Sequence, residues 1–107
     1  MKKPPRIKIP KNAHVGDVIE IKTLATHIME TGNRTDAKGK KIARDIIHTF
    51  TATFEGKPVF SADLGPGIAA NPYIAFYLKV PGPGALKMTW HDDSGGKIVE
   101  NVTLDVL

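Results

Sequence analysis

Apolar and polar residues alternate along most of this chain with the two-residue period of half-buried β-strands. In the segment Val18–Leu24, Ile19 and Ile21 fall on one face while Glu20 and Lys22 fall on the other. No stretch shows a convincing helical period, so we predict about seven short strands separated by turns. The other segments with a strand pattern are Arg6–Ile9, Ile46–Phe54, Pro58–Ala62, Ile74–Val80, Ala85–His91 and Ile98–Leu107.

One polar and one apolar face per strand are typical of antiparallel sheets that pack face to face. The sequence therefore predicts an all-β, immunoglobulin-like antiparallel β-sandwich, with residues 1–107 forming a single domain. We expect Leu86, Met88 and Trp90 to point inward from one strand, with Trp90 in the core. The Gly- and Pro-rich crossing at 63–72 is expected to contain one short turn of helix.

The connection at 27–44 is the most informative segment, because it is long, charged and carries its own turn signal, Asp36-Ala37-Lys38-Gly39. Long connections in compact domains are usually functional or disordered, and the turn signal favours a protruding hairpin. The hairpin is either a solvated tip or a projection that docks on another protein or frames an anionic group. Its cationic residues are Arg34, Lys38, Lys40, Lys41 and Arg44, against the acidic residues Glu30 and Asp36.

Seven residues in and near this hairpin are candidates for binding a partner protein. Arg34 and Arg44 suit bidentate contacts to carboxylates or oxyanions. Met29 and Tyr73 offer an apolar and an amphipathic anchor, residue types enriched in interface cores. An alternative for Tyr73 is a hydroxyl that holds its own loop. The candidates are His27, Met29, Glu30, Arg34, Arg44, Asn71 and Tyr73.

Composition narrows the classes of function. The formal net charge is +4 with a pI of about 9.4, which favours an acidic partner or only a soluble surface. The cations are dispersed without a nucleic-acid motif, so nucleic-acid binding is not expected. The chain has no cysteine, which excludes thiol catalysis, thiolate metal sites, disulfides and covalent carriage of sulfur. No apolar run follows the lysines at positions 2 and 3, so neither a signal peptide nor a membrane span is expected.

Catalytic and metal motifs are weak. We find no nucleophile elbow, phosphate-binding glycine loop or Cys-His pair, and no cofactor is expected. Asp92 and Asp93 are adjacent and are expected to favour a turn. His27, Met29 and His91 could form a copper site, but a surface histidine and an interface or core methionine are favoured. His48, on the apolar face of its strand, is expected to be a core or rim residue.

Three segments together resemble a known family. In chain order they read HIMETGNRTDAKGKKIARDII, FSADLGPGIAANPYIAFY and MTWHDD. Their order and spacing resemble SoxZ, a subunit of the SoxYZ carrier of bacterial thiosulfate oxidation, over roughly residues 6–106. The chain departs from the family pattern at Ile28 and Ala43, where the family often has proline.

The resemblance implies the same sandwich fold and a non-catalytic subunit. It implies a heterodimer with a SoxY-like protein, which carries sulfur intermediates on a cysteine of its C-terminal arm, and transient contacts with other Sox pathway enzymes. It also implies a periplasmic location reached by co-export with a signal-bearing partner. No catalytic residue is carried over. A generic immunoglobulin-like binding module and a small copper-binding protein remain the alternatives.

Overall fold

The computed structural model describes residues 4–27, 29–65, 67–68 and 70–107. Within these ranges the chain has no helix, so none is long and apolar enough to cross a bilayer. The all-β prediction is confirmed, and the strand boundaries fall close to the predicted ones. The strands are β1 (Arg6–Lys8), β2 (Val18–Leu24), β3 (Ile47–Phe54), β4 (Lys57–Asp63), β5 (Tyr73–Lys79), β6 (Gly84–Asp92) and β7 (Lys97–Leu104).

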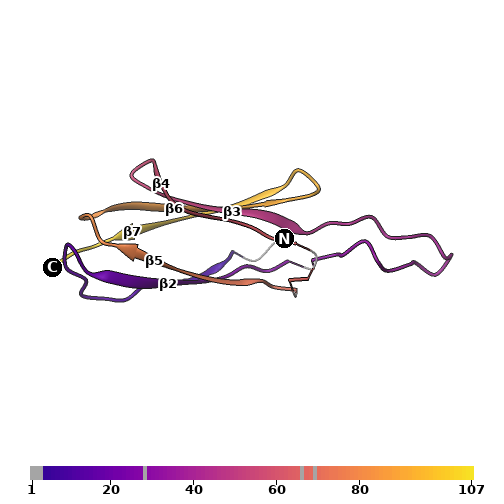
Figure 1. The fold of residues 1–107 in the computed structure, drawn as a ribbon, viewed down its shortest axis with the longest axis horizontal. Coiled ribbons are helices and arrows are strands. Elements are labelled where there is room, and N and C mark those ends of the chain that lie inside the picture. The colour runs from indigo at the N-terminus through magenta and orange to yellow at the C-terminus, as the bar shows by residue number, and fades with distance from the viewer. Residues whose placement is uncertain (1–3, 28, 66, 69) are drawn as a thin grey trace.

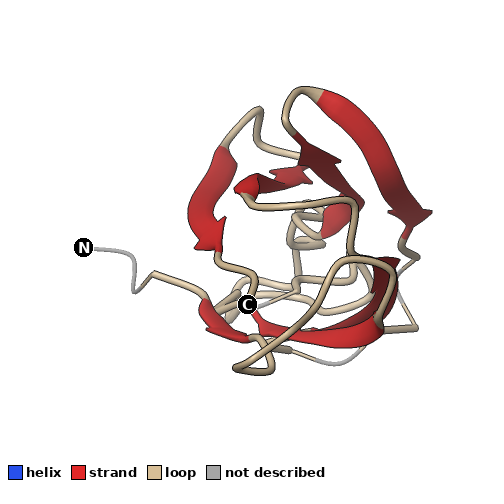
Figure 2. Ribbon diagram, turned by 90° about the vertical axis from the view of Figure 1, so that its left-hand side faces the viewer, coloured by secondary structure: helices blue, strands red, loops and turns tan. Residues whose placement is uncertain are grey.

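The strands form two antiparallel sheets that pack face to face. One sheet has three strands in the order β1-β2-β5, and the other has four in the order β4-β3-β6-β7. Figure 1 shows the four-stranded sheet above the three-stranded one, and Figure 2 shows the two curved layers from the end. This arrangement confirms the predicted immunoglobulin-like antiparallel β-sandwich.

Four aromatic rings join the sheets at the centre of the core. Phe50 of β3 lies 5.0 Å from Trp90 of β6 and 5.7 Å from Phe76 of β5, measured between ring centroids. Phe60 of β4 stacks on Phe76 at 5.0 Å. Leu86 and Met88 are fully buried beside this cluster, and Trp90 is 1% exposed. The predicted inward face of β6 is therefore confirmed.

The alternation in β3 is broken at its first residues. The pairing of β3 with β6 shifts between Ile47 and Thr49, so Ile46 and Ile47 are both fully buried. A β-bulge adds a residue to one strand, and the residues on either side of it change faces. His48 lies half-buried, with Nδ1 2.7 Å from the Thr49 hydroxyl. Of the two predicted environments for His48, the rim is correct.

The crossing at 63–72 differs from the prediction, because its described residues contain no helix. One turn is present, in which the Ile68 N–H donates to the Gly65 carbonyl at 3.2 Å. Pro66 and Ala69 of this crossing lie outside the described residues, as do Ile28 and residues 1–3. Proline and glycine favour turns over helix here, and they override the apolar residues at 68–70.

The connection at 27–44 projects from one end of the sandwich (Figure 1). The molecule measures 58 × 25 × 21 Å, and the projection gives it this elongated shape. The predicted protruding hairpin is therefore confirmed.

Candidate docking surface at the protruding hairpin

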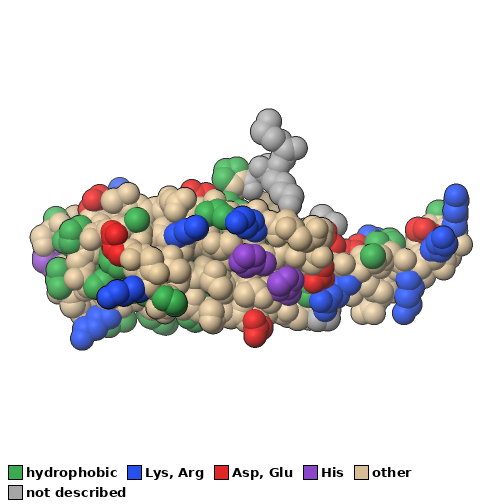
Figure 3. Space-filling view, turned by 90° about the horizontal axis from the view of Figure 1, so that it is seen from above, with side chains coloured by type: hydrophobic (Ala, Val, Ile, Leu, Met, Phe, Trp, Pro, Cys, Tyr) green, Lys and Arg blue, Asp and Glu red, His purple; other side chains and the backbone are tan. Residues whose placement is uncertain are grey.

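The tip of the hairpin is a tight turn, as its sequence predicts. The Gly39 N–H donates to the Asp36 carbonyl at 3.0 Å. The Asp36 carboxylate accepts the backbone N–H groups of Lys38 at 2.9 Å and Lys40 at 3.0 Å. An aspartate that accepts from the following residues stabilises a turn. Figure 3 shows cationic side chains along the projection and at its tip.

Backbone bonds link the two arms below the tip. The Ile42 N–H donates to the Arg34 carbonyl at 2.8 Å. At the base, Glu30 and Asp45 exchange two backbone hydrogen bonds of 2.8 Å each. A reciprocal pair of this kind is the unit of an antiparallel ladder. The arms therefore form a hydrogen-bonded ribbon between the tip and the sandwich.

Gly32 allows the arms to approach each other closely. Its φ is +86°, a conformation that side chains other than glycine rarely adopt. A Cβ built at this position would lie 3.1 Å from the Cβ of Arg44 on the opposite arm. The backbone conformation thus favours glycine, and a side chain here would crowd the opposite arm.

His27 and Asn71 anchor the first arm to the crossing at 63–72. The His27 N–H donates to the Asn71 side-chain oxygen at 2.9 Å, and the Asn71 N–H donates to the His27 carbonyl at 2.7 Å. Asn71 has a φ of +54°, which asparagine tolerates better than most residues. Both are candidate partner-binding residues, and here they bind each other.

Met29 lies in the core below the hairpin. It is 4% exposed, and its sulfur lies 3.3 Å from the N–H of Ile47. Its φ is +52°, a left-handed conformation that costs a residue other than glycine about 1–3 kcal/mol. Of the two roles considered for this methionine, interface or core, the structure places it in the core.

Glu30 and Arg34 form a bidentate ion pair on the first arm. Arg34 Nε donates to the two carboxylate oxygens of Glu30 at 3.0 and 3.1 Å, and Nη2 donates to Oε2 at 2.6 Å. The hydrogen bonds from Arg34 hold the pKa of Glu30 below its usual value, and those to Glu30 raise the pKa of Arg34. A hollow of about 280 Å³ lies beside the pair, between Met29 and Thr31.

Arg44 binds the sandwich in the same bidentate way. Its Nε and Nη2 donate to the two oxygens of Asp93 at 2.7 and 3.0 Å. Asp93 also accepts the Ile46 N–H at 3.2 Å, and its own N–H donates to the Ile46 carbonyl at 3.0 Å. The Arg44 hydrogen bonds hold the pKa of Asp93 below its usual value. Both arginines thus make the predicted kind of contact, a bidentate contact to a carboxylate. The carboxylates belong to this chain and not to a partner.

A histidine and two aspartates meet under the hairpin base. His27 Nε2 lies 3.9 Å from Asp45 Oδ1 and 3.7 Å from Asp92 Oδ2. The three ligand atoms lie within 4.8 Å of one another, a spacing at which a metal ion could be held. The Met29 N–H, however, donates to His27 Nδ1 at 2.9 Å. The neutral ring therefore carries its proton on Nε2, directed at the carboxylates, which favours a polar cluster over a metal ligand.

The residues of the copper hypothesis do not come together. His91 alternates along β6 with the buried residues Trp90 and Asp92, so it lies on the outer face of the four-stranded sheet. His27 approaches Asp92 on the inner side of that sheet. Met29 directs its sulfur at the N–H of Ile47. The copper set of His27, Met29 and His91 is therefore wrong.

Tyr73 lies apart from the hairpin contacts. It begins β5 and is 59% exposed, opposite Leu24 of β2. Its side chain lies on the outer face of the three-stranded sheet. Of the candidates, the structure therefore groups six at the hairpin and its base and leaves Tyr73 on a neighbouring face.

Sequence reasoning did not predict the contacts that Asp93 and Gly32 make with the hairpin arm at Arg44. Asp92 alone completes the predicted turn, because its Oδ1 accepts from the Ser94 hydroxyl at 2.6 Å and from the Gly96 N–H at 2.8 Å. Asp93 is left to bind Arg44, which is 49 positions away. A turn of this kind needs one aspartate, so a second aspartate at the same turn indicates another contact. The sequence does not show that this contact is with Arg44.

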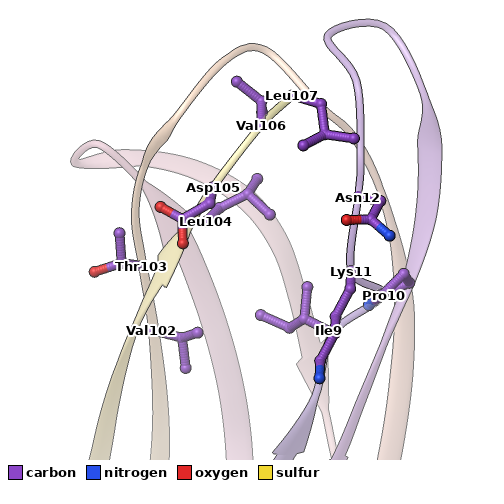
Figure 4. A pocket seen from close by; sticks show the side chains of 10 residues that line it. All are labelled: Ile9, Pro10, Lys11, Asn12, Val102, Thr103, Leu104, Asp105, Val106 and Leu107. Carbon is purple, nitrogen blue, oxygen red and sulfur yellow. The ribbon is translucent and has the colours of Figure 1, made fainter.

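A separate groove lies between the N-terminal segment and the end of the chain (Figure 4). It encloses about 410 Å³ between residues 9–12 and 102–107, and Ile9 lies across it from Val102. The charged side chains that line it are Lys11 and Asp105. The groove therefore lies between the segment that follows β1 and the end of β7.

The fold and site together define an all-β, immunoglobulin-like sandwich with a charged hairpin that is braced by its own ion pairs. A family model described as sulphur oxidation protein SoxZ matches residues 7–103, which is nearly the whole chain. The chain belongs to the SoxZ family, as the sequence resemblance implied, and thereby to the proteins of Sox sulfur oxidation.

Solved structures share the fold at low sequence identity. A superoxide reductase (neelaredoxin) from Ignicoccus hospitalis has a TM-score of 0.74 and 18% identity, over 99% of this chain and 82% of that one. The sulfur carrier protein SoxY from Chlorobium limicola f. thiosulfatophilum has a TM-score of 0.65 and 13% identity, over 96% and 78%. A superoxide reductase from Nanoarchaeum equitans has a TM-score of 0.66 and 19% identity, over 96% and 93%. These likenesses show the fold alone. A search of curated proteins found no match.

Proposed function

We propose that this chain is the non-catalytic subunit of a SoxYZ-type carrier complex. In this role it binds a SoxY-like protein, which carries the sulfur intermediate on the cysteine of its C-terminal arm. It then helps to present that arm to the pathway enzymes. The observation that carries the proposal is the SoxZ family match over residues 7–103. The absence of cysteine agrees with it, because a chain without a thiol needs a partner to carry sulfur.

The hairpin supports the proposal because it is pre-organised for contact. Glu30 and Arg34 neutralise each other on one arm, and Asp93 fixes Arg44 on the other. Rigid groups lose less conformational entropy on binding than flexible ones do. The exposed lysines near the tip then provide the charge that attracts a protein partner. Their positions are Lys38, Lys40 and Lys41.

The proposed partner would have a fold like that of this chain. The SoxY of Chlorobium limicola f. thiosulfatophilum shares the sandwich architecture with this chain. The proposed complex therefore pairs two sandwiches of related shape in a heterodimer. We also propose a periplasmic location, reached by co-export with the signal-bearing subunit, and transient contacts with the other Sox enzymes.

Reconstitution tests the proposed function. Thiosulfate oxidation is measured with the purified pathway enzymes and a SoxY-like protein from a neighbouring gene, with and without this chain. We expect turnover to require the chain in stoichiometric amount with the SoxY-like protein. An unrelated immunoglobulin-like domain of similar size serves as the control. Equal turnover without the chain would contradict the proposal.

A further inference from the structure

The outer face of the three-stranded sheet carries exposed aromatic and apolar side chains at both of its ends. Tyr73 and Tyr77 project from β5 and are 59% and 68% exposed. Leu24 of β2 lies directly opposite Tyr73, and Val18 of β2 lies diagonally across from Tyr77. Directly opposed and diagonal side chains on one sheet face are within contact range. Leu24 with Tyr73, and Val18 with Tyr77, thus form two apolar pairs on one sheet face, with Lys22 and Ala75 between them. We call this surface the tyrosine face.

The core does not require these side chains. Along β5 the inward residues are Ile74, Phe76 and Leu78, all of which are buried. The tyrosines alternate with them and face outward. Solvent-exposed strand positions are usually polar, whereas tyrosine is enriched in protein interfaces because it combines a large apolar ring with a hydroxyl. The tyrosine face thus has the composition of a contact surface.

Its charge is strongly one-sided. Arg6, Lys8, Lys22 and Lys79 lie on this face, against the single carboxylate of Glu20. Glu20 lies 3.6 Å from Lys22, so it offsets one of the four cations.

A shallow depression shows where a partner side chain would enter. It encloses about 250 Å³ and is bordered by Arg6, Lys22, Leu24 and Tyr73. An apolar centre bordered by cations is complementary to an apolar centre bordered by carboxylates.

The tyrosine face is continuous with the hairpin base. Tyr73 comes two residues after Asn71, which binds His27 at the start of the hairpin. The Ala25 N–H donates to the Pro72 carbonyl at 3.1 Å, which ties the end of β2 to the start of β5. One partner protein can therefore contact the face and the hairpin base together.

We propose that the carrier subunit covers the tyrosine face, and that it meets this face with an apolar contact bordered by aspartate and glutamate. The identity of the occupant rests on the function proposed above. A protein surface fits better than a nucleic acid, because four cations around an aromatic centre do not make the basic stripe that a phosphate backbone needs. It also fits better than a membrane, since a flat sheet face offers no amphipathic helix to lie among lipids.

Binding measurements on the full chain test this proposal. The affinity for the purified full-length SoxY-like protein is measured for the wild type and for two double variants, Tyr73→Ala with Tyr77→Ala, and Lys22→Glu with Lys79→Glu. We expect the tyrosine variant to bind at least about tenfold more weakly, as loss of interface anchors does. We expect the charge variant to associate more slowly and to lose most of the salt dependence of the wild-type rate.

The matched control is Lys87→Glu with Lys97→Glu, which makes the same charge change on the outer face of the four-stranded sheet. It should bind like the wild type. All variants change exposed side chains, and their melting temperatures confirm that they fold.

The possible results distinguish a failure of the tyrosine-face assignment from a failure of the proposed function. Wild-type binding that neither double variant weakens would overturn the assignment of the tyrosine face and leave the function standing. No binding by the wild type would overturn both. If vesicles with anionic lipid or single-stranded DNA bound the chain through Lys22 and Lys79 while the SoxY-like protein did not, the face would belong to another class of partner and the proposal would fail.

Discussion

Arg44 and Asp93 are 49 positions apart in the chain, yet a bidentate ion pair joins them, with its shorter hydrogen bond at 2.7 Å. Arg44 ends the returning arm of the hairpin, and Asp93 lies in the turn between β6 and β7. Because Asp93 also exchanges backbone and side-chain bonds with Ile46, the arm is held at two adjacent points. The pair therefore fixes the direction in which the hairpin leaves the sandwich.

Gly32→Ala should destabilise the chain more than Gly39→Ala. Both glycines have positive φ, but only Gly32 has the opposite arm within 4 Å, with Arg44 Cβ at 3.1 Å. We expect Gly39→Ala to cost about 1 kcal/mol of unfolding free energy for strain alone, and Gly32→Ala to cost more than that. Urea unfolding measures both. Equal losses would show that the arms are not closely packed.

Asn71→Ala should loosen the base of the hairpin. The change removes the acceptor of the His27 N–H and puts alanine at a φ of +54°. We expect a loss of about 1–3 kcal/mol in unfolding free energy and faster hydrogen exchange at His27. Asn71→Asp keeps an acceptor and tolerates the conformation, so it should stay close to the wild type. A wild-type exchange rate in Asn71→Ala would rule out this anchor.

Stability should fall in acid through Glu30 and Asp93. Their arginine partners hold both pKa values in the folded chain below the ordinary values of 4.5 and 3.8. The unfolded chain therefore binds more protons in acid, so the two groups stabilise the fold at neutral pH. This contribution is lost as the pH falls from about these ordinary values through the lowered ones. Thermal unfolding between pH 7 and pH 3 measures the decline.

The control for the acid prediction is a double variant, Glu30→Gln with Asp93→Asn. It removes both titrating groups, so its stability should decline less steeply below the ordinary carboxyl range. The same steepness as in the wild type would mean that other carboxylates control the acid response.

Reversing the charge of both hairpin arginines should impair partner binding or turnover by the proposed complex. Arg34→Glu with Arg44→Glu places like charges beside Glu30 and Asp93 and breaks both ion pairs. We expect either weaker binding of the SoxY-like protein or slower transfer to a pathway enzyme, measured by affinity and by thiosulfate turnover. Lys38→Glu with Lys40→Glu makes the same charge change at the tip but leaves both ion pairs intact, so it separates the attraction of the partner by the tip lysines from the bracing of the hairpin by the arginines. Unchanged affinity and turnover in the arginine variant would remove the hairpin from the account.

The alternation of apolar and polar residues predicts the sandwich, because it shows which face of each strand is buried. The alternation in 18–24 and 74–80, and the threonine and phenylalanine alternation in 49–54, all correspond to burial in the structure. The break at Ile46 and Ile47 does not follow from alternation, since a bulge depends on the neighbouring strand. The described residues of the crossing at 63–72 contain no helix, in a segment where proline and glycine favour turns over a short apolar run.

The sequence predicts which residue types form the candidate site, but not which residues form ion pairs there. The protruding hairpin and its turn follow from the length and turn signal of 27–44. The arginines were expected at carboxylates, but only the structure shows that Glu30 and Asp93 belong to the same chain. Long-range contacts of this kind carry no local signature.

The most direct test of the account is the mass of the complex after co-expression with the SoxY-like protein of a neighbouring gene. Size exclusion followed by native mass spectrometry gives this mass and the stoichiometry. We expect a stable one-to-one heterodimer that survives purification. A chain that elutes alone or as a homodimer, with the SoxY-like protein folded in the same extract, would contradict it.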